Sequence, residues 1–421
     1  MQMALPRRAA RPNSLGMKRR TFLATAVAAM ATPALGADPP APPPAGVDVA
    51  FATWLSGFRA RALASGLPAA VVEAELDGLA PDPRVRGADR NQPEFSRPFS
   101  HYVKRAAGED RAAIGRRRMA ELEPGLARIQ SDFGVPREML VAIWGMESGY
   151  GATLGSQDVI RSMATLAADG RRQAFAEEQL LAALRIIASG EWPRSRLVGS
   201  WAGAMGQTQF IPATYLSLAV DADGDGRRDL WGSALDALAS AANLLAKAGW
   251  RRGEGWAIEV SAPDGFDFSV AETLKAPLPA WAEMGLVRAD GAALSGGPSE
   301  ASLIAPTGWR GPLFLLLPNH FVIRRYNNAV TYAMAGGLLA DRIAGRPDLV
   351  RAWPEEVPLS LSDRIAAQTA LQAAGHDVGE PDGVIGLKSR AALRAWQKAQ
   401  GLPADGYLSP DMVARLRGQA G

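Results

Sequence analysis

Apolar residues recur at α-helical spacing along most of residues 49–257, and no other feature of the chain limits its possible folds as strongly. One helix is expected to begin at Pro136, because proline is favoured in the first turn of a helix. Another is expected over residues 233–248 and to end at Gly249, since glycine readily adopts the conformation that terminates helices. The sequence therefore predicts a mainly α fold over this stretch.

The composition of the sequence changes between residues 258 and 318. Glycine, proline and short apolar runs such as residues 314–317 predict a small strand-rich insert there. Helical patterns return at residues 327–344, and a segment with three prolines follows. We therefore expect one large domain over residues 49–345, a linker over 346–360, and a compact helical module over 361–418.

Residues 1–37 have the pattern of an export signal. Lys18, Arg19 and Arg20 precede an apolar run over residues 22–30, and small residues follow at 34–37. The run is shorter than the ~20 residues that a membrane span needs, and its Arg-Arg-Thr-Phe-Leu start resembles a twin-arginine signal, with Met17 as an alternative start. After a proline-rich tether at 38–48, we expect a soluble periplasmic protein without stable membrane insertion; the alternative is an uncleaved or mitochondrial-type leader.

The charge balance argues against nucleic acid as a partner. The chain has 46 basic and 43 acidic residues, but six of the basic ones and no acidic one lie in residues 1–37, which leaves 40 basic against 43 acidic residues. Without a basic surplus, the electrostatic affinity for phosphate backbones is weak. The chain also has no cysteine and only three histidines, which excludes thiol chemistry and makes a histidine-based metal site or catalytic triad improbable.

Glu147 is the first candidate for acid–base chemistry. On a helix it shares a face with the apolar Leu140, Ile143 and Trp144, and Gly149 follows at a predicted helix end. A carboxyl group in apolar surroundings has a raised pKa, which suits a general acid. The alternative is a solvated, inert glutamate at a frayed helix end.

Residues 199–212 combine small residues with amides. Glycine and alanine positions allow the backbone to approach a ligand closely, and the Gln209 amide offers both a donor and an acceptor for sugar hydroxyl or acetamido groups. Ser200 lies in the same segment. The alternative is a tight structural turn with a core glutamine.

Residues 221–231 follow the spacing of a calcium loop. Asp221, Asp223 and Asp225 occupy positions 1, 3 and 5, and the carbonyl group of Arg227 would serve position 7. Position 12 is Gly232 rather than glutamate, so Asp236 is the candidate for the missing charge. We predict a structural Ca²⁺ ion, with solvated acidic turns as the alternative.

Residues 321–333 read as a strand-like run that ends in Tyr326 and Asn327 and then turns into a helix. Tyr326 and Tyr332 present flat faces and hydroxyl groups, and Asn327 a two-way amide. The alternative is a set of aromatic side chains that caps a core.

In this order, the four segments resemble the B-type lytic murein transglycosylases. The matching motifs are Glu-Ser-x-Tyr-Gly (147–151), Gly-Ala-Met-Gly-x-x-Gln-Phe-x-Pro (203–212), Asp-Gly-Asp-Gly-x-x-Asp-Leu-Trp (223–231) and Arg-Tyr-Asn (325–327). Residues 92–95 and 169–172 also look like family segments. Residues 361–418 are similar to a small peptidoglycan-binding module, with Asp382-Gly383 and Asp405-Gly406 in its two turns.

The resemblance implies a lysozyme-like helical domain and a three-helix wall-binding module. It implies cleavage of the MurNAc–GlcNAc β-1,4 bond of peptidoglycan without water, with a 1,6-anhydro-MurNAc end as product. Glu147 matches the single residue that acts as acid and then as base, so a second carboxylate is not required. The implied partner is the glycan strand, bound by a monomer, with cell-wall enzyme complexes as candidate assemblies.

The resemblance also implies the residues that contact substrate. Arg171 and Arg172 match a pair that faces the peptide stem, where their forked guanidinium groups would bind carboxylates. The remaining positions match residues of the glycan cleft or of its acetamido side: Tyr102, Ser148, Ser200, Gln209, Tyr326, Asn327 and Tyr332.

Two rival functions remain at this point. A hydrolytic muramidase would use the same acid and a second carboxylate to activate water, for which Glu177, Glu178 and Glu191 are candidates without motif support. A non-catalytic protein would bind the wall through residues 361–418 alone.

Overall fold

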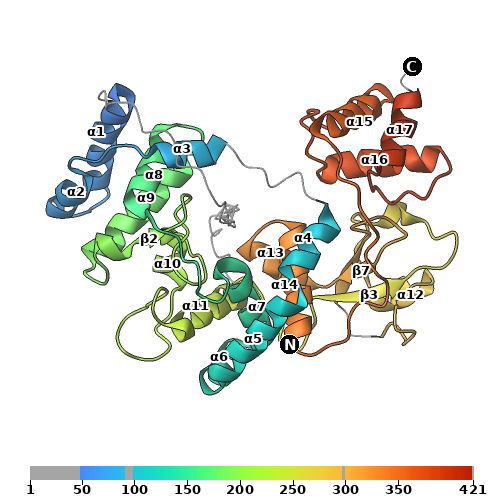
Figure 1. Ribbon diagram of the computed structural model, residues 1–421, viewed down its shortest axis with the longest axis horizontal. Helices are drawn as coiled ribbons and strands as arrows, with labels where there is room; N and C mark the ends of the chain where they lie inside the picture. The colour runs from blue at the N-terminus through green and yellow to red at the C-terminus, as the bar shows by residue number, and fades with distance from the viewer. Residues whose placement is uncertain (1–47, 91–97, 296–298, 420–421) are drawn as a thin grey trace, which may run out of the picture.

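The computed structural model describes residues 48–90, 98–295 and 299–419 (Figure 1). The predicted leader at 1–37, all of the tether except Asp48, and the family segment at 92–95 lie outside the described residues. Among the described residues, no helix has the length and apolar character needed to cross a membrane.

Most of the helices gather in one body. Its N-terminal part contains α1 (Val49–Ala64), α2 (Ala69–Leu76), α3 (Pro83–Arg90), α4 (Phe99–Ala106), α5 (Glu109–Glu121), α6 (Glu123–Phe133) and α7 (Arg137–Ser148). Its remaining helices are α8 (Val159–Ala168), α9 (Gln173–Ala188), α10 (Pro212–Leu218), α11 (Ala234–Lys247), α13 (Pro318–Tyr326) and α14 (Val330–Ile343). The short strands β1 (Gln157–Asp158) and β2 (Val198–Gly199) pair antiparallel, and η2 (Arg194–Arg196) precedes β2.

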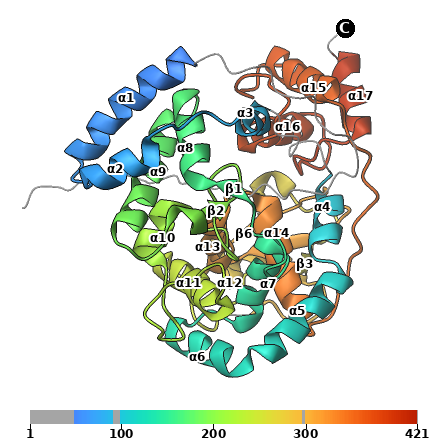
Figure 2. The ribbon, with the colours of Figure 1, turned by 60° about the vertical axis from the view of Figure 1, so that its left-hand side comes forward.

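Helix α7 forms the centre of this body. It packs against α5, α6, α11 and α14, which surround it in both views (Figures 1 and 2). Every residue from Met139 to Met146 is buried, so the helix is enclosed on all sides rather than along the single apolar face that we predicted. The expected ends of the helix are confirmed, since Pro136 precedes its first residue and Gly149 follows its last in a left-handed conformation.

The strand-rich insert is confirmed as a five-stranded sheet in the order β4-β6-β7-β3-β5, with every pair antiparallel. Its own apolar core surrounds the fully buried Trp281. The elements of the insert are β3 (Ala257–Ser261), η3 (Phe268–Val270), β4 (Ala276–Pro277), α12 (Leu278–Glu283), β5 (Val287–Arg288), β6 (Glu300–Ile304) and β7 (Leu313–Leu316).

The strand-like interpretation of residues 321–326 was wrong, because this run is part of helix α13. The consecutive β-branched Val322 and Ile323 suggested a strand. Pro318 at the first helical position favours a helix, and the buried residues Asn319, Val322, Ile323 and Tyr326 follow helical spacing. Burial against the helical body decides the conformation of this segment.

The C-terminal module is a three-helix unit, as predicted. Its helices are α15 (Leu361–Ala373), α16 (Leu387–Ala399) and α17 (Pro410–Gln419). Leu371, Leu393 and Trp396 lie in their shared core. Helix α15 begins with a capping box, in which Ser360 and Asp363 satisfy each other's backbone N–H groups.

Ion pairs join this module to the insert. Arg390 and Arg394 of α16 both donate to the half-buried carboxylate of Glu272, at 2.8 and 2.7 Å. Lys398 pairs with Asp267 at 2.8 Å. The module is therefore docked against the sheet and does not hang on its linker (Figure 1).

Candidate active site

Glu147 lies in the last turn of α7, where the chain reverses sharply. Gly149, Tyr150 and Gly151 have φ values of 59°, 64° and 82°, so three successive residues are left-handed. Tyr150 is held in this conformation by its hydroxyl group, which donates to the Arg111 carbonyl oxygen at 2.7 Å. A Cβ atom on Gly145 would lie 2.6 Å from the Tyr150 ring, so a glycine is needed where the ring folds back on the helix.

The Glu147 carboxyl group is half-buried and bound by one phenol. Tyr332 of α14 donates to Glu147 Oε1 at 2.5 Å. Burial raises the pKa of Glu147 to about 7, although the hydrogen bond from Tyr332 acts in the opposite direction. A carboxyl group with this pKa holds a proton near neutral pH and can also release it, as acid–base catalysis requires.

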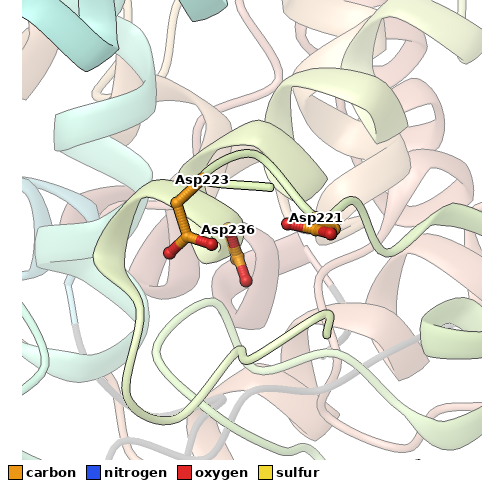
Figure 3. A group of neighbouring side chains, drawn as sticks. All are labelled: Asp221, Asp223 and Asp236. Carbon is orange, nitrogen blue, oxygen red and sulfur yellow. The ribbon is translucent and has the colours of Figure 1, made fainter. Parts of the chain in front are cut away.

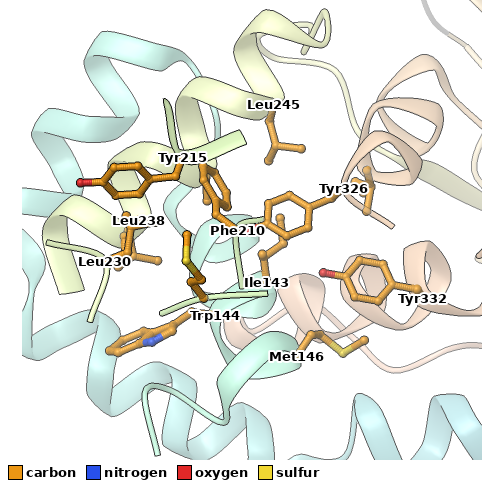
Figure 4. Packing of buried hydrophobic residues seen from close by; sticks show 14 of the residues in the cluster. Ile143, Trp144, Met146, Phe210, Tyr215, Leu230, Leu238, Leu245, Tyr326 and Tyr332 are labelled. Carbon is orange, nitrogen blue, oxygen red and sulfur yellow. The ribbon is translucent and has the colours of Figure 1, made fainter. Parts of the chain in front are cut away.

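Two further tyrosines lie near this pair. Tyr326 of α13 is buried, donates to the Thr208 carbonyl oxygen at 2.5 Å, and packs its ring 6.1 Å from that of Phe210 (Figure 4). Tyr102 of α4 is half-buried. Burial is the main cause of the raised pKa of Tyr332, followed by Glu147 and then Tyr326, and Tyr102 makes the smallest contribution. The structure thus brings Glu147, Tyr102, Tyr326 and Tyr332 together.

Asn327 follows Tyr326 directly, at the C-terminal end of α13. Its Oδ1 accepts a hydrogen bond from the backbone N–H of Ala329 at 3.1 Å, and the side chain is half-buried. This bond stabilises the turn between α13 and α14, and it fixes the amide at the end of the helix that carries Tyr326.

Ser148 connects α7 to the loop of residues 199–210. Its buried hydroxyl group donates to the Gln207 carbonyl oxygen at 2.6 Å and accepts from the Gly151 N–H at 2.9 Å. Both contacts lie within the protein, so in this structure Ser148 sets the position of the loop relative to Glu147.

The loop of residues 199–210 contains two isolated antiparallel β-bridges. Met205 pairs with both Gly199 and Phe210, and Gln209 adopts a left-handed φ of 52°. The Gln209 amide is half-buried and donates to the Gly206 carbonyl oxygen at 2.8 Å, and the Ser200 hydroxyl accepts from the Ala204 N–H at 3.1 Å. Both predicted binding residues therefore have intramolecular partners that fix their orientation.

Arg171 and Arg172 converge on a single carboxylate, that of the buried Asp89 at the end of α3. The distances from their guanidinium nitrogen atoms to Asp89 Oδ1 are 2.8 and 3.5 Å. Arg172 also lies over the Trp201 ring, 5.9 Å from its centre. The sequence analysis missed Asp89; a lone aspartate in a predicted helix gives no signal that two arginines will meet it.

The acidic residues considered for water activation differ in their surroundings. Glu177 is bound by Trp54 at 2.8 Å and Arg61 at 2.7 Å, and Glu191 by Tyr215 at 2.7 Å and by Arg228. Burial would raise the pKa of both carboxyl groups, but these hydrogen bonds outweigh it and hold both pKa values below the ordinary one. Glu178 is exposed.

The acidic loop brings three carboxylates together. Asp221, Asp223 and Asp236 each offer an oxygen atom within 4.8 Å of the other two (Figure 3). Asp236 is fully buried at the start of α11, and burial raises its pKa, with further repulsion from Asp223. Asp221 is half-buried and Asp223 is exposed, so the cluster opens to solvent on one side. A cluster of hard oxygen donors without an ion-pair partner for Asp236 among the described residues fits a divalent cation such as Ca²⁺.

Asp225, another predicted ligand, is not a member of that group of carboxylates. Asp225 is exposed, and its Oδ1 accepts from the backbone N–H of Arg227 at 2.8 Å. The Arg227 guanidinium lies 5.6 Å from the centre of the Trp192 ring. The substitution of Asp236 for the missing position 12 agrees with the geometry of the cluster.

A separate cavity of about 530 Å³ lies between the insert and the C-terminal module. Phe266, Trp309 and Leu402 are among its lining residues, and none of the predicted site residues lines it. It is therefore distinct from the region around Glu147.

Two family models match the chain. Residues 50–341 match the transglycosylase SLT domain, and residues 360–416 match a putative peptidoglycan binding domain. Membrane-bound lytic murein transglycosylase B of Escherichia coli is 32% identical over 238 residues, which cover 53% of this chain and 61% of the E. coli protein, less than two thirds of its length.

Solved structures similar to this chain also come from lytic transglycosylases. SltB3 of Pseudomonas aeruginosa, in complex with NAG-anhNAM-pentapeptide, is 49% identical with a TM-score of 0.83 and covers 87% of this chain and 99% of that one. E. coli Slt35 in complex with calcium is 28% identical with a TM-score of 0.59 and covers 69% and 92%. The resemblance and the lysozyme-like fold predicted from the sequence are thereby confirmed, and the chain belongs to the SLT-domain transglycosylases and has a peptidoglycan-binding domain at its C-terminal end.

Proposed function

We propose that this chain is a lytic transglycosylase that cleaves the MurNAc–GlcNAc β-1,4 bond of peptidoglycan and leaves a 1,6-anhydro-MurNAc end. The single observation that carries the proposal is the half-buried Glu147, whose pKa of about 7 allows it to give and take a proton in one reaction cycle. Family membership and the peptidoglycan fragment bound to the similar SltB3 support the choice of substrate.

Glu147 acts twice in the proposed reaction. It first donates its proton to the glycosidic oxygen, so that the bond to the anomeric carbon breaks and the leaving sugar departs with a new hydroxyl group. The resulting carboxylate then accepts the proton of the C6 hydroxyl while that oxygen bonds to the anomeric carbon. Tyr332 donates to Oε1 and stabilises the carboxylate between the two steps.

The surroundings of the other acids favour this scheme over hydrolysis. Glu177 and Glu191 are held as ion pairs with Arg61 and Arg228. A base that must take a proton from water is weakened by such pairs, because they lower its pKa. We therefore assign no second carboxylate, and the substrate's own acetamido group is the proposed stabiliser of the intermediate.

We assign substrate contacts by position around Glu147. Tyr326, Asn327 and Tyr332 would line the acetamido side. Ser200, Gln209 and Tyr102 would be further contacts of the glycan cleft. Arg171 and Arg172 would bind peptide-stem carboxylates, since a guanidinium has five donors and its bond to Asp89 leaves several of them available. For Ser148, whose hydroxyl group has three protein partners, we propose a positioning role.

We further propose a structural Ca²⁺ ion held by Asp221, Asp223 and Asp236, with Asp225 and the Arg227 carbonyl as additional candidate ligands. Bound calcium would neutralise the three clustered carboxylates, including the buried one of Asp236, and fix the loop that precedes α11. The calcium complex of Slt35 supports the assignment.

We also propose that the protein acts in the periplasm as an exported, soluble monomer. The leader pattern of residues 1–37 and the wall-binding domain support this location. The wall-binding domain would hold glycan strands while Glu147 cleaves them.

Digestion of purified sacculi tests the function. Mass spectrometry of the muropeptides is expected to find products that lack the mass of one water and end in 1,6-anhydro-MurNAc. Products with an added water would establish a hydrolytic muramidase instead. Binding to sacculi without any soluble product would establish a non-catalytic wall-binding protein.

A further inference from the structure

Glu356 is a buried carboxylate in the predicted linker, with only 7% of its surface exposed. Its Oε2 accepts a hydrogen bond from the backbone N–H of Ser100 at 2.6 Å, in the first turn of α4. Its Oε1 accepts one from the hydroxyl group of Tyr407 at 2.9 Å. A negative charge at the N-terminal end of a helix is favoured by the helix dipole, so Glu356 stabilises the start of α4.

A second linker residue supports the same helix end. The Trp353 ring packs against Phe99, the first residue of α4, with ring centres 5.6 Å apart, and against Phe314 of the insert at 6.0 Å. The linker therefore holds α4 by one polar and one aromatic contact, and it connects the helix to the sheet.

Helix α4 is connected to the proposed acid through helix α14. It packs against α14, which carries Tyr332 (Figure 2). Tyr102, two residues after Ser100, lies close enough to Tyr332 to affect it electrostatically, and Tyr332 donates to Glu147. A shift of α4 would therefore move Tyr102 relative to Tyr332.

The contact between Glu356 and Tyr407 depends on how the C-terminal module is docked. Tyr407 follows Asp405, whose carboxylate accepts the backbone N–H of Trp309 in the insert at 3.0 Å. The ion pairs of Glu272 and Asp267 hold the same interface. The Tyr407 hydroxyl reaches Glu356 in this docked arrangement of the module.

We propose that Glu356 is a positioning residue through which the docked C-terminal module sets the geometry of the Tyr332–Glu147 pair. Tyr407 orients Glu356, Glu356 fixes the start of α4, and α4 packs against α14 and places Tyr102 near Tyr332. The inference rests on the proposed function, since it assigns the acid to Glu147. It implies that the module affects turnover as well as wall binding, even for a glycan too short to reach the module.

The test uses the full chain and a soluble tetrasaccharide of alternating NAG and NAM. Tyr407→Phe removes only the hydroxyl group, Glu356→Gln removes the charge, and Glu355→Gln is the matched control, because Glu355 is exposed and adjacent. We expect Tyr407→Phe and Glu356→Gln to lower kcat about tenfold, since small displacements of catalytic groups cost this much, while KM changes less than threefold. Sacculus binding and the melting temperature of Tyr407→Phe should stay near those of the control.

Equal kcat values for Tyr407→Phe, Glu356→Gln and the Glu355→Gln control would overturn the inference, as would a loss of kcat that only follows a loss of folded protein. The wild-type products separate this outcome from failure of the proposed function. If the wild type releases anhydro ends and the variants match the control, only the positioning role is wrong. If the wild type releases hydrolysed ends or nothing, the proposed function itself is wrong.

Discussion

The hydroxyl group of Tyr332 donates to Oε1 of Glu147 across 2.5 Å and joins helix α14 to the last turn of helix α7. The two influences on the Glu147 pKa act in opposite directions. Burial favours the protonated acid and raises the pKa, and the phenol favours the carboxylate and lowers it. The balance, a pKa of about 7, is suited to a group that must be an acid in one step and a base in the next.

Removal of the phenol should move the pH profile. In the wild type, activity should fall as pH rises above about 7, because the acid loses its proton. Tyr332→Phe removes the donor that favours the carboxylate, so the alkaline limb should move up by about one pH unit. The measurement is kcat/KM against pH. Tyr326→Phe is the control, since that hydroxyl donates to Thr208, and an unmoved limb in Tyr332→Phe would contradict the role given to the bond.

Glu147→Gln should abolish turnover and increase stability at alkaline pH. Loss of the acid should lower kcat at least about a hundredfold, with sacculus binding retained. The folded-state pKa is raised from 4.5 to about 7, so the stability contributed by the protonated group is present below pH 4.5 and is lost as pH rises through 7. The unfolding free energy of the variant, relative to that of the wild type, should therefore rise by about 3 kcal/mol between pH 4.5 and pH 8. Urea denaturation at the two pH values measures this, and a constant difference would contradict it.

His320 should make the protein acid-sensitive. It is fully buried, both ring nitrogens lack hydrogen-bond partners, and burial, with a smaller effect of Arg324, lowers its pKa from 6.5 to about 3. Below pH 6.5 the unfolded chain binds a proton that the folded chain excludes, so stability is lost as pH falls from 6.5 toward 3.

The matching experiment compares His320→Phe with the wild type. The variant keeps a ring against Trp256 and Phe321 and removes the titrating group. As the pH falls from 7 to 5, the unfolding free energy of the variant relative to that of the wild type should increase by about 2 kcal/mol. His101→Phe, at an exposed position, serves as the control, and identical pH dependence of all three proteins would refute the prediction.

Calcium should raise the melting temperature, and EDTA should reverse the effect. An ion at a hundredfold excess over its Kd stabilises the fold that binds it by about 3 kcal/mol. Asp236→Asn should reduce the shift between calcium and EDTA, whereas Asp264→Asn, on an exposed loop of the insert, should not. Differential scanning calorimetry with Mg²⁺ as a comparison measures the effect, and equal shifts in both variants would remove the cluster as the binding site.

The sequence predicted the features that depend on local periodicity and failed where tertiary contacts decide. Helix α7, the insert and the three-helix module followed from apolar spacing, glycine and proline. Helix α13 was misread because two β-branched residues outweighed a proline at its start. Glu356 looked like one polar residue in a proline-rich linker, and nothing local indicated that it would meet Ser100 and Tyr407, 256 and 51 residues away.

The docking of the C-terminal module has a consequence for the products. Two of its arginines share the carboxylate of Glu272, which is only 11% exposed, and partly buried ion pairs of this kind are screened by salt less than exposed ones. The distance between the part of the glycan bound by the C-terminal module and the glycosidic bond cleaved at Glu147 is then fixed. Digests should accordingly contain glycan fragments of a preferred length, unlike those of an enzyme whose binding domain is attached by a flexible linker.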